Sequence, residues 1–206
     1  VSHELKNPIA SIIAQTENYA ARDDDDALAI NKIKEQAVRM NKLISEISEA
    51  AVVDNDLVTK AREKFDLSTT VNEILDHYID SNEHPDLQLS SEIQKNIVFL
   101  GLPDRIGQVL VNVLDNAISF SKPKGNIKVE LHKRWRRKPI LIIEDSGPGV
   151  SEASRELIFE RFYTSRSGGA EIKNSSGLGL FICKQIIEAH GGKISVCGSS
   201  LGGARF

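Results

Sequence analysis

The sequence predicts an α+β protein in two parts, an antiparallel hairpin of two long helices followed by an α/β layer. Apolar residues recur every three or four positions through the first part, which is the spacing of helices that pack side by side. That spacing stops at residues 63–68, and strand-like alternation and helical stripes then follow each other along the chain. Two glycine-rich segments also interrupt the second part. We therefore expect a helical domain over residues 1–62 and an α/β domain over residues 63–206.

Composition indicates an ordinary globular chain. It has 206 residues, of which 40% are hydrophobic and 27% charged, with a formal net charge of -3. This charge gives no electrostatic reason to expect a nucleic-acid partner, and no apolar run is long enough to cross a bilayer. Cys183 and Cys197 lack metal-ligand spacing, so we expect two reduced, packed thiols. Because the chain begins at Val1 and ends just after a turn, we expect a piece of a longer protein.

Two heptad-like seams define the predicted hairpin. The first consists of Leu5, Ile9, Ile12, Thr16 and Tyr19, and the second of Ile30, Ile33, Ala37, Met40, Ile44, Ile47 and Ala51. An acidic turn at residues 22–26 separates them. A two-helix hairpin exposes much of each seam, so we expect a second copy to complete a four-helix bundle. The alternative is that the seams pack against the rest of this chain.

The first eight residues carry a candidate reactive group. His3 stands beside Glu4, and Asn7 follows one helical turn later, so His3 and Asn7 would share a helix face. Most histidines next to acids are surface residues, so this motif alone does not establish a reactive site. Pro8 predicts either a kink just after His3 or a helix start, because it lacks a backbone donor.

Helices and strands follow each other in the second part. The predicted elements are a helix over 68–80, strands over 87–93 and 97–100, a helix over 103–119, neighbouring strands around 127–131 and 140–143, and a helix that opens at 175–180 and ends at 190–192. We expect strand 140–143 to be the more deeply buried of its pair, because it is a continuous apolar run. Five cations around Trp135 suggest a solvated hairpin tip, which the negative net charge favours over a nucleic-acid patch.

Polar residues at the ends and edges of these elements form a candidate pocket. Asn112, Asn116 and Ser119 fall together at the margin of an apolar helix stripe, where they would line a pocket or hydrogen-bond a loop. Asp145 directly follows a buried strand, and the glycines behind it allow a backbone to approach a ligand. The turn at residues 175–180 feeds a helix amino terminus, which favours phosphate. The polar segment 165–174 is expected to be a lid over that turn.

Taken in order, these motifs resemble those of the sensor histidine kinases of two-component signalling, over nearly the whole chain. The segments similar to the family's boxes are residues 2–8 (H box), 112–117 (N box), 145–149 (first glycine box), 159–163 (F box) and 177–180 (second glycine box). Details at 116–121 and 174–180 are similar to the ChvG/ExoS-type envelope and acid-stress sensor kinases. The resemblance implies that the hairpin serves dimerisation and phosphotransfer, and that the second domain is an ATP-binding α/β sandwich of the histidine-kinase, Hsp90 and gyrase type.

The resemblance also implies roles for single residues. His3 would be the phospho-acceptor and Glu4 the base that takes its proton, while Asn7 would position water for dephosphorylating a response regulator. The implied cofactors are ATP and Mg²⁺. The implied cofactor-binding residues are Asn112, Asn116, Asp145, Gly147, Gly149, Arg161, Tyr163, Gly177, Leu178 and Gly179. Among them, Asn116 with Asn112 would hold Mg²⁺, Asp145 would bind the adenine amino group, the glycines of 177–180 would cradle the phosphates, and Arg161 or Arg166 would contact the γ-phosphate.

The function implied is ATP-dependent phosphorylation of His3, followed by transfer to an aspartate of a response-regulator receiver domain. The expected assembly is a homodimer, in the cytoplasmic part of an inner-membrane-anchored bacterial protein, with no nucleic acid and no membrane contact from this stretch. Two positions depart from the family pattern. Ser119 stands where the N box commonly has a lysine, so Lys122 or an arginine would substitute, and Ser175 stands where the second glycine box often has a glycine. The alternatives are an ATPase of the same superfamily and a dimeric pseudokinase or phosphatase scaffold.

Overall fold

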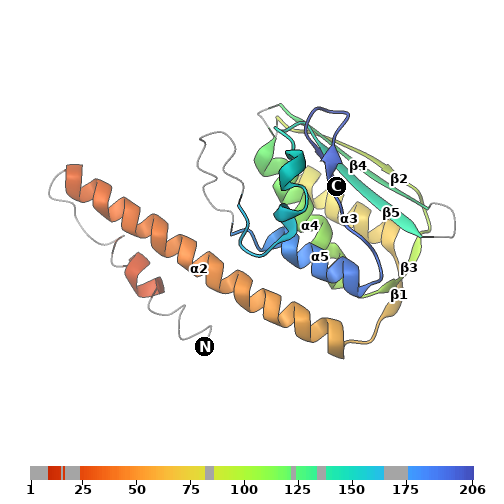
Figure 1. The fold of residues 1–206 in the computed structure, drawn as a ribbon, viewed down its shortest axis with the longest axis horizontal. Coiled ribbons are helices and arrows are strands. Elements are labelled where there is room, and N and C mark those ends of the chain that lie inside the picture. The colour runs from red at the N-terminus through yellow and green to blue at the C-terminus, as the bar shows by residue number, and fades with distance from the viewer. Residues whose placement is uncertain are drawn as a thin grey trace.

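The computed structural model describes residues 9–14, 16, 24–81, 86–121, 124–133, 138–164 and 176–206 (Figure 1). Residues 9–14 and 16 are helical. The other elements are α2 (Asp24–Thr59), β1 (Glu63–Asp66), α3 (Leu67–Asp80), β2 (Gln88–Ile93), β3 (Val98–Gly101), α4 (Pro103–Phe120), β4 (Asn126–Lys133), β5 (Pro139–Asp145), the 3-10 turns η2 (Glu152–Ser154) and η3 (Leu157–Phe159), α5 (Gly179–Ala189), β6 (Cys197–Gly198) and β7 (Ala204–Arg205). The predicted α+β class is confirmed.

A five-stranded sheet in the order β2-β4-β5-β7-β6 forms one layer. Strands β2 and β4 are parallel, whereas the remaining neighbours are antiparallel. Alternation decides which face of β4 is buried: Ile127, Val129 and Leu131 are at most 1% exposed. Between them, Lys128 points to the other face, where its Nζ lies 3.0 Å from the Glu92 carboxylate and 2.7 Å from that of Glu130.

The expectation that β5 is buried more deeply than β4 is wrong for its first half. Only its last four residues are buried, whereas Pro139, Ile140 and Leu141 are half-buried. The reason is that β5 pairs with β4 along its whole length but meets β7 only near Glu144. The first half of β5 therefore has a strand neighbour on one side only.

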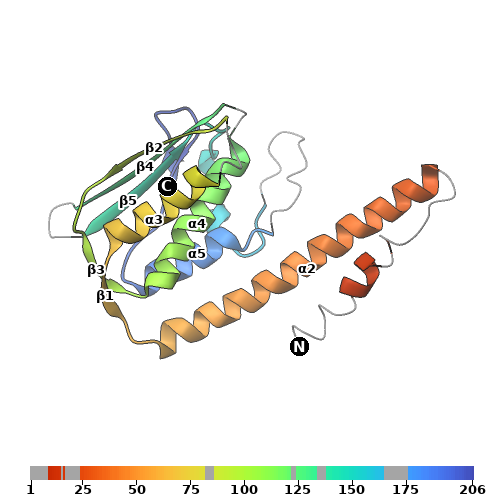
Figure 2. The same ribbon diagram turned by 180° about the vertical axis from the view of Figure 1, so that it is seen from behind.

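Helices α3, α4 and α5 cover one face of the sheet, and α2 runs across the outside of this helical layer (Figures 1 and 2). Each covering helix buries an apolar stripe, which for α4 consists of Ile106, Val109, Leu110, Val113, Leu114 and Ala117. Asp66 caps α3, because its side chain accepts a hydrogen bond from the Ser68 amide at 2.9 Å. The core therefore lies between the sheet and these three helices.

The seam of α2 is used in two different ways. Towards the end of the helix, Val53 is fully buried in the core of the α/β layer, with Ala50 and Leu57 packed against it. Further back, Ile33, Met40 and Ile47 are 51%, 53% and 51% exposed. The apolar residues near the end of α2 thus pack against the rest of the chain. The exposed apolar residues further back can pack against another partner.

Strand β1 was not predicted from the sequence. It pairs antiparallel with β3, and the rings of Phe65 and Phe99 meet edge to face with their centroids 6.0 Å apart. A strand of four residues is too short to show a two-residue period, and its partner lies far along the chain. The same shortness hides β6, where Cys197 is exposed. The expectation of two packed thiols is therefore wrong for Cys197.

Candidate functional site

Asp145 is a buried carboxylate whose two oxygens have different surroundings. It ends β5 and is 4% exposed. Its Oδ1 accepts hydrogen bonds from the amides of Gly147 at 2.8 Å and Ala204 at 3.1 Å. Within the described part of the chain, no hydrogen bond is recorded for Oδ2. This geometry fixes the carboxylate and leaves one strong acceptor for a ligand amino group.

Glycines allow the backbone to close tightly around Asp145. A Cβ on Gly203 would lie 2.1 Å from Asp145 Oδ1, and one on Gly147 would lie 2.8 Å from the Phe120 carbonyl oxygen. Gly149 has a φ of +72°, and its Cβ would lie 3.1 Å from the Gly203 carbonyl oxygen. Gly203 was read from the sequence only as part of a turn, so its place in the site was missed. The one signal was the glycine pair before the last strand.

Two asparagines of α4 lie one helical turn apart, and the first of them contacts the opening turn of α5. Asn112 and Asn116 are half-buried at the margin of the helix stripe, and Ser119 is exposed. The Asn112 amide nitrogen donates to the Gly179 carbonyl oxygen at 3.4 Å, which leaves its oxygen as a possible ligand. For Asn116, the described residues include no hydrogen-bond partner. The contact of Asn112 with Gly179 brings the candidate metal-binding and phosphate-binding segments together.

The turn before α5 is held in a shape that requires glycine. Gly177 has a φ of +74°, and a Cβ there would lie 2.6 Å from the Tyr163 carbonyl oxygen. Its own carbonyl accepts from the Phe162 amide at 3.1 Å. Leu178 is 2% exposed and forms the N-cap of α5 without a side-chain cap. Within the described part of the chain, the first amides of α5 are therefore available to an anion at the positive end of the helix.

Arg161 and Tyr163 border this turn in different ways. The Arg161 guanidinium lies 4.5 Å from the centroid of the Phe181 ring, in the first turn of α5. The Tyr163 hydroxyl donates to Ser154 Oγ at 3.1 Å. Arg161 thus places a positive charge near the start of α5, whereas Tyr163 holds η2 against the turn. His3, Glu4, Asn7 and Arg166 lie outside the described residues, as do the expected lid at 165–174 and the basic tip around Trp135.

Helix α2 reaches the same turn through Glu46. The Ser176 hydroxyl donates to the Glu46 carboxylate and accepts from the Leu178 amide at 3.1 Å. Burial raises the pKa of Glu46, and the positive charge of Lys42 acts against this. An acidic side chain therefore lies beside the turn that is the candidate for phosphate binding.

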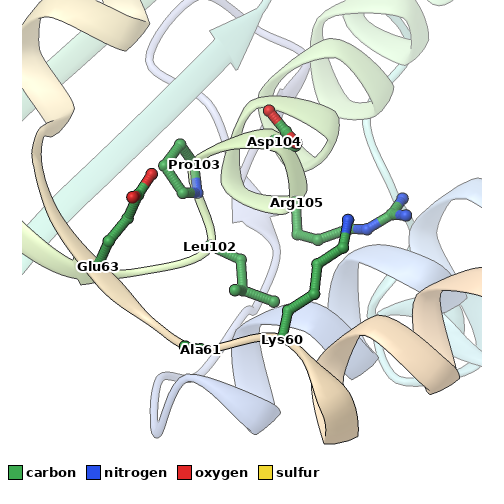
Figure 3. Close-up of a pocket in the computed structure, with 7 residues that line it drawn as sticks. All are labelled: Lys60, Ala61, Glu63, Leu102, Pro103, Asp104 and Arg105. Atoms are coloured by element: carbon green, nitrogen blue, oxygen red, sulfur yellow. The ribbon is translucent and has the colours of Figure 1, made fainter.

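A charged cluster joins the end of α2 to the start of α4. Asp56 is 5% exposed, and its Oδ2 lies 2.8 Å from Lys60 Nζ and 2.5 Å from Arg105 Nη2. Hydrogen bonds from Lys60 and then from Arg105 hold the pKa of Asp56 below its usual value. Lys60 and Arg105 also line a cavity of about 240 Å³ (Figure 3) together with Ala61, Glu63, Leu102, Pro103 and Asp104. The lining of this cavity includes no predicted site residue.

Cys183 is a structural residue beside the site. It is fully buried between α4 and α5, and burial raises its pKa to about 12, although Asn112 acts in the opposite direction. Its sulfur lies 3.8 Å from the Val109 carbonyl oxygen. A thiol in this state is a poor nucleophile, so the site does not depend on cysteine chemistry.

The described residues contain no group of three or more His, Cys, Asp or Glu side chains arranged to hold a metal. The oxygens of Asn112 and Asn116, one helical turn apart, nevertheless suit Mg²⁺. This ion prefers oxygen ligands and is commonly bound by one or two protein groups together with substrate phosphates. In the same described portion, no helix has the length and apolar character needed to cross a bilayer.

Comparisons with known proteins agree with this geometry. A family model for "Histidine kinase-, DNA gyrase B-, and HSP90-like ATPase" matches residues 101–206, and one for the "His Kinase A (phospho-acceptor) domain" matches residues 1–55. Sensor protein ChvG of Rhizobium meliloti (strain 1021) is 34% identical over 229 residues, covering 100% of this chain and 38% of that protein. The chain thus spans well under half of this relative, whose name agrees with the predicted ChvG/ExoS-type similarity.

Solved structures of histidine kinases have a similar fold. The mycobacterial sensor histidine kinase MprB is 29% identical, with a TM-score of 0.59, and the match covers 70% of this chain and 93% of that one. Histidine kinase ThkA in complex with the response regulator protein TrrA is 25% identical, with a TM-score of 0.67. That match covers 99% of this chain and 57% of the solved one, so both parts of the fold have a solved counterpart.

Proposed function

This chain belongs to the histidine kinases, and from that premise we propose that it is the catalytic core of a sensor kinase that phosphorylates His3 with ATP. The phosphoryl group then passes to an aspartate of a response-regulator receiver domain. Residues 1–62 form the dimerisation and phosphotransfer domain, and residues 63–206 form the ATP-binding domain. The core acts as a homodimer in the cytoplasmic part of a membrane-anchored protein.

The arrangement of Asp145 carries the nucleotide assignment. Two backbone amides occupy Oδ1, so Oδ2 is the acceptor for the adenine amino group. The glycine-rich turn before α5 offers free amides to the phosphates, and Arg161 adds a positive charge nearby. One end of the pocket thus selects an amino-substituted base and the other selects an anion, as ATP requires.

Asn116 and Asn112 hold Mg²⁺ against the phosphates in this proposal. Their amide oxygens suit the ion, and the Asn112 contact with Gly179 keeps them beside the phosphate-binding turn. When bound, Mg²⁺ offsets the charge of the phosphoryl group in transfer. The N box of this family commonly has a lysine where this chain has Ser119. Lys122 is therefore the residue to test for a contact with the phosphates.

The reaction at His3 is a direct phosphoryl transfer. An imidazole nitrogen attacks the γ-phosphorus, the bond to the β-γ bridging oxygen breaks, and ADP leaves. Glu4 takes the imidazole proton. The receiver aspartate then attacks the same phosphorus and breaks its bond to nitrogen. Asn7 positions water for removing the phosphoryl group from the regulator. The solved complex of ThkA with TrrA supports a response regulator as the partner.

Incubation of the dimer with γ-labelled ATP and Mg²⁺ tests this proposal. We expect an acid-labile, alkali-stable label on the wild-type protein and none on His3→Gln. His77→Gln is a matched control, because His77 is exposed on α3 away from the site. Label that survives in His3→Gln would show that the acceptor is another residue. Hydrolysis of ATP without any labelled protein would instead indicate a simple ATPase, and dephosphorylation of a regulator by unlabelled protein would indicate a phosphatase scaffold.

A further inference from the structure

We propose that His190 is a positioning residue that sets the register between α4 and α5. Through that register it holds the magnesium-binding asparagines against the phosphate-binding turn. This inference rests on the proposed function, because it concerns how the ATP site keeps its shape. His190 lies at the end of α5 opposite that turn, and it does not take part in the candidate site itself.

The partners of the His190 ring define its protonation state. Nδ1 lies 2.7 Å from the Ile186 carbonyl oxygen, which only accepts, so Nδ1 carries the proton. Nε2 lies 3.1 Å from the Leu102 amide nitrogen, which only donates, so Nε2 is unprotonated. His190 is therefore a neutral imidazole that joins the C-cap of α5 to the residue before α4.

The residues around the His190 ring leave space for it. A Cβ on Gly101 would lie 2.8 Å from His190 Cδ2 and 3.0 Å from its Nε2. The Phe99 ring packs near the imidazole, with the two ring centroids 6.0 Å apart, and its Cε1 would lie 2.7 Å from the same Cβ. Gly101 thus leaves the space that brings the ring within reach of the Leu102 amide.

The Leu102 amide needs this acceptor. Leu102 is 6% exposed and is the N-cap of α4, but it forms no side-chain cap. Its carbonyl already accepts from the amides of Arg105 and Ile106 at 3.1 and 3.0 Å. With its amide held by His190, the position at which α4 begins is fixed to α5.

Three contacts repeat one register along the antiparallel pair α4 and α5. Leu102 meets His190, Val109 meets Cys183, and Asn112 meets Gly179. Each step forward along α4 is matched by a step of nearly equal length backward along α5. A slip by one helical turn would move α4 by about 5.4 Å and would carry Asn112 away from Gly179. His190 secures the end of this ladder that lies farthest from the nucleotide.

The same helix end also meets the segment that follows α2. The Arg62 guanidinium donates to the Ala189 carbonyl oxygen at 2.5 Å. The contact made by His190 therefore lies where the connection from the phosphotransfer helix meets the ATP-binding domain.

Two substitutions distinguish the effect of the hydrogen bond to Leu102 from the effect of the volume of the His190 ring. His190→Gln keeps an acceptor for Leu102 and a donor for Ile186, whereas His190→Phe keeps the ring shape but has no acceptor. We expect His190→Phe to bind Mg·ADP at least tenfold more weakly than the wild type, and His190→Gln to stay within about threefold. Both should bind adenosine as the wild type does, because the amides that hold Asp145 belong to Gly147 and Ala204, which lie on neither helix. His77→Phe serves as the control.

Nitrogen NMR of the His190 ring reports its protonation state in the absence of nucleotide. We expect the neutral form protonated at Nδ1, and faster exchange of the Leu102 amide in His190→Phe than in His190→Gln. Equal Mg·ADP affinity in all variants, an equal loss of adenosine and Mg·ADP binding in His190→Phe, or a ring protonated at Nε2 would each overturn the proposal. If the wild type binds neither ligand, the proposed function fails, and the ring state and amide exchange then decide the role of His190.

Discussion

The two carboxylate oxygens of Asp145 differ in their surroundings, and the proposed specificity for the base rests on this difference. Backbone amides of Gly147 and Ala204 donate to Oδ1, and an amide oxygen at the same place can accept the same two bonds. Only Oδ2 is available to a ligand. The residue can therefore be changed at one atom without disturbing what holds it in place.

Asp145→Asn should weaken ATP binding about 10- to 100-fold while leaving the fold intact. The asparagine oxygen can keep both backbone bonds, but its NH₂ group then faces the adenine amino group, and two donors cannot pair. The loss corresponds to about 1.5–3 kcal/mol, as for a hydrogen bond to a charged group. Isothermal titration calorimetry with Mg·ATP measures the affinity, and thermal unfolding checks the fold. An unchanged affinity would mean that Oδ2 does not face the base.

Gly177→Ala should weaken Mg·ATP binding at least tenfold, and Gly191→Ala should leave it within about twofold. Both glycines have nearly the same left-handed φ, +74° and +72°, so both substitutions carry a backbone cost of about 1–2 kcal/mol. Only at Gly177 would the new Cβ meet a backbone oxygen, at 2.6 Å, whereas Gly191 has no atom within 4 Å of that position. Calorimetry on both variants compares them. Equal losses in the two would show that the effect comes from stability alone.

At this scale the sequence predicted the residues that act through their own chemistry. Asp145 and the glycines of the turn before α5 stand beside recognisable strand and helix ends, and Asn112 stands at the margin of a recognisable apolar stripe. Gly203 and His190 were missed, because each acts through a partner distant in the chain. Gly203 makes room for Asp145 only once β7 lies beside β5, and no local pattern announces that pairing.

The end of α2 docks on the helical layer through charge as well as apolar packing. Val53 is buried in the core, and Asp56 pairs with Lys60, which directly follows α2, and with Arg105 of α4. Asp54, by comparison, is exposed, and its carboxylate accepts from the Gln185 side chain at 2.9 Å. The two aspartates offer a matched pair on one helix.

Asp56→Asn should lower the free energy of unfolding at neutral pH, and Asp54→Asn should change it little. The pKa of Asp56 is lowered in the folded state, so its ionised form stabilises that state. This contribution is fully present well above the unfolded value of 3.8 and is lost as the pH falls towards the lower folded pKa.

Urea denaturation between pH 3.5 and 8 measures the effect. The difference between wild type and Asp56→Asn should stay constant above about pH 5 and narrow below about pH 4. Glu46 affects the free energy of unfolding of both proteins with the opposite sign. Its raised pKa favours the protonated form, so its contribution falls as the pH rises through that pKa. A difference that widens on acidification would contradict the assignment to Asp56.

Helices with continuous apolar stripes were predicted to within a few residues. The predicted helix over 103–119 is α4, Pro103–Phe120, and that over 68–80 is α3, Leu67–Asp80. Strand β6 was not found, since two residues do not establish a period, and β1 was not found, since Phe65 is its one apolar residue. The relative register of α4 and α5 was equally hidden, because side-chain periodicity defines a helix face but not its position along a neighbour.

Across the whole molecule, α2 divides its apolar residues between two surfaces. Ala50, Val53 and Leu57 near its end pack on the core of the ATP-binding layer, and Ile33, Met40 and Ile47 stay about half exposed at seven-residue intervals. This interval is the period of a coiled-coil seam. It supports the proposed dimer through the phosphotransfer hairpins.

The double substitution Ile33→Glu with Met40→Glu should raise the dimer dissociation constant at least 100-fold. Burying each of these side chains is worth about 1.5–3 kcal/mol, and an unpaired carboxylate in their place adds a further cost. Sedimentation equilibrium measures the constant. Val38→Glu is the control, because Val38 is also 45% exposed but lies about 140° around the helix from Ile33. A protein that stays dimeric in the double variant would have its interface elsewhere.

The burial of Val53 determines where this chain can be divided. A fragment that starts at Glu63 would lack Ala50, Val53 and Leu57, and would turn the part of the α4 and α5 surface that they cover towards water. Such a fragment would tend to self-associate, since an uncovered apolar patch is an aggregation liability. Fusion of this ATP-binding domain to a foreign signalling module should therefore carry α2 from Glu46 onward as an integral part.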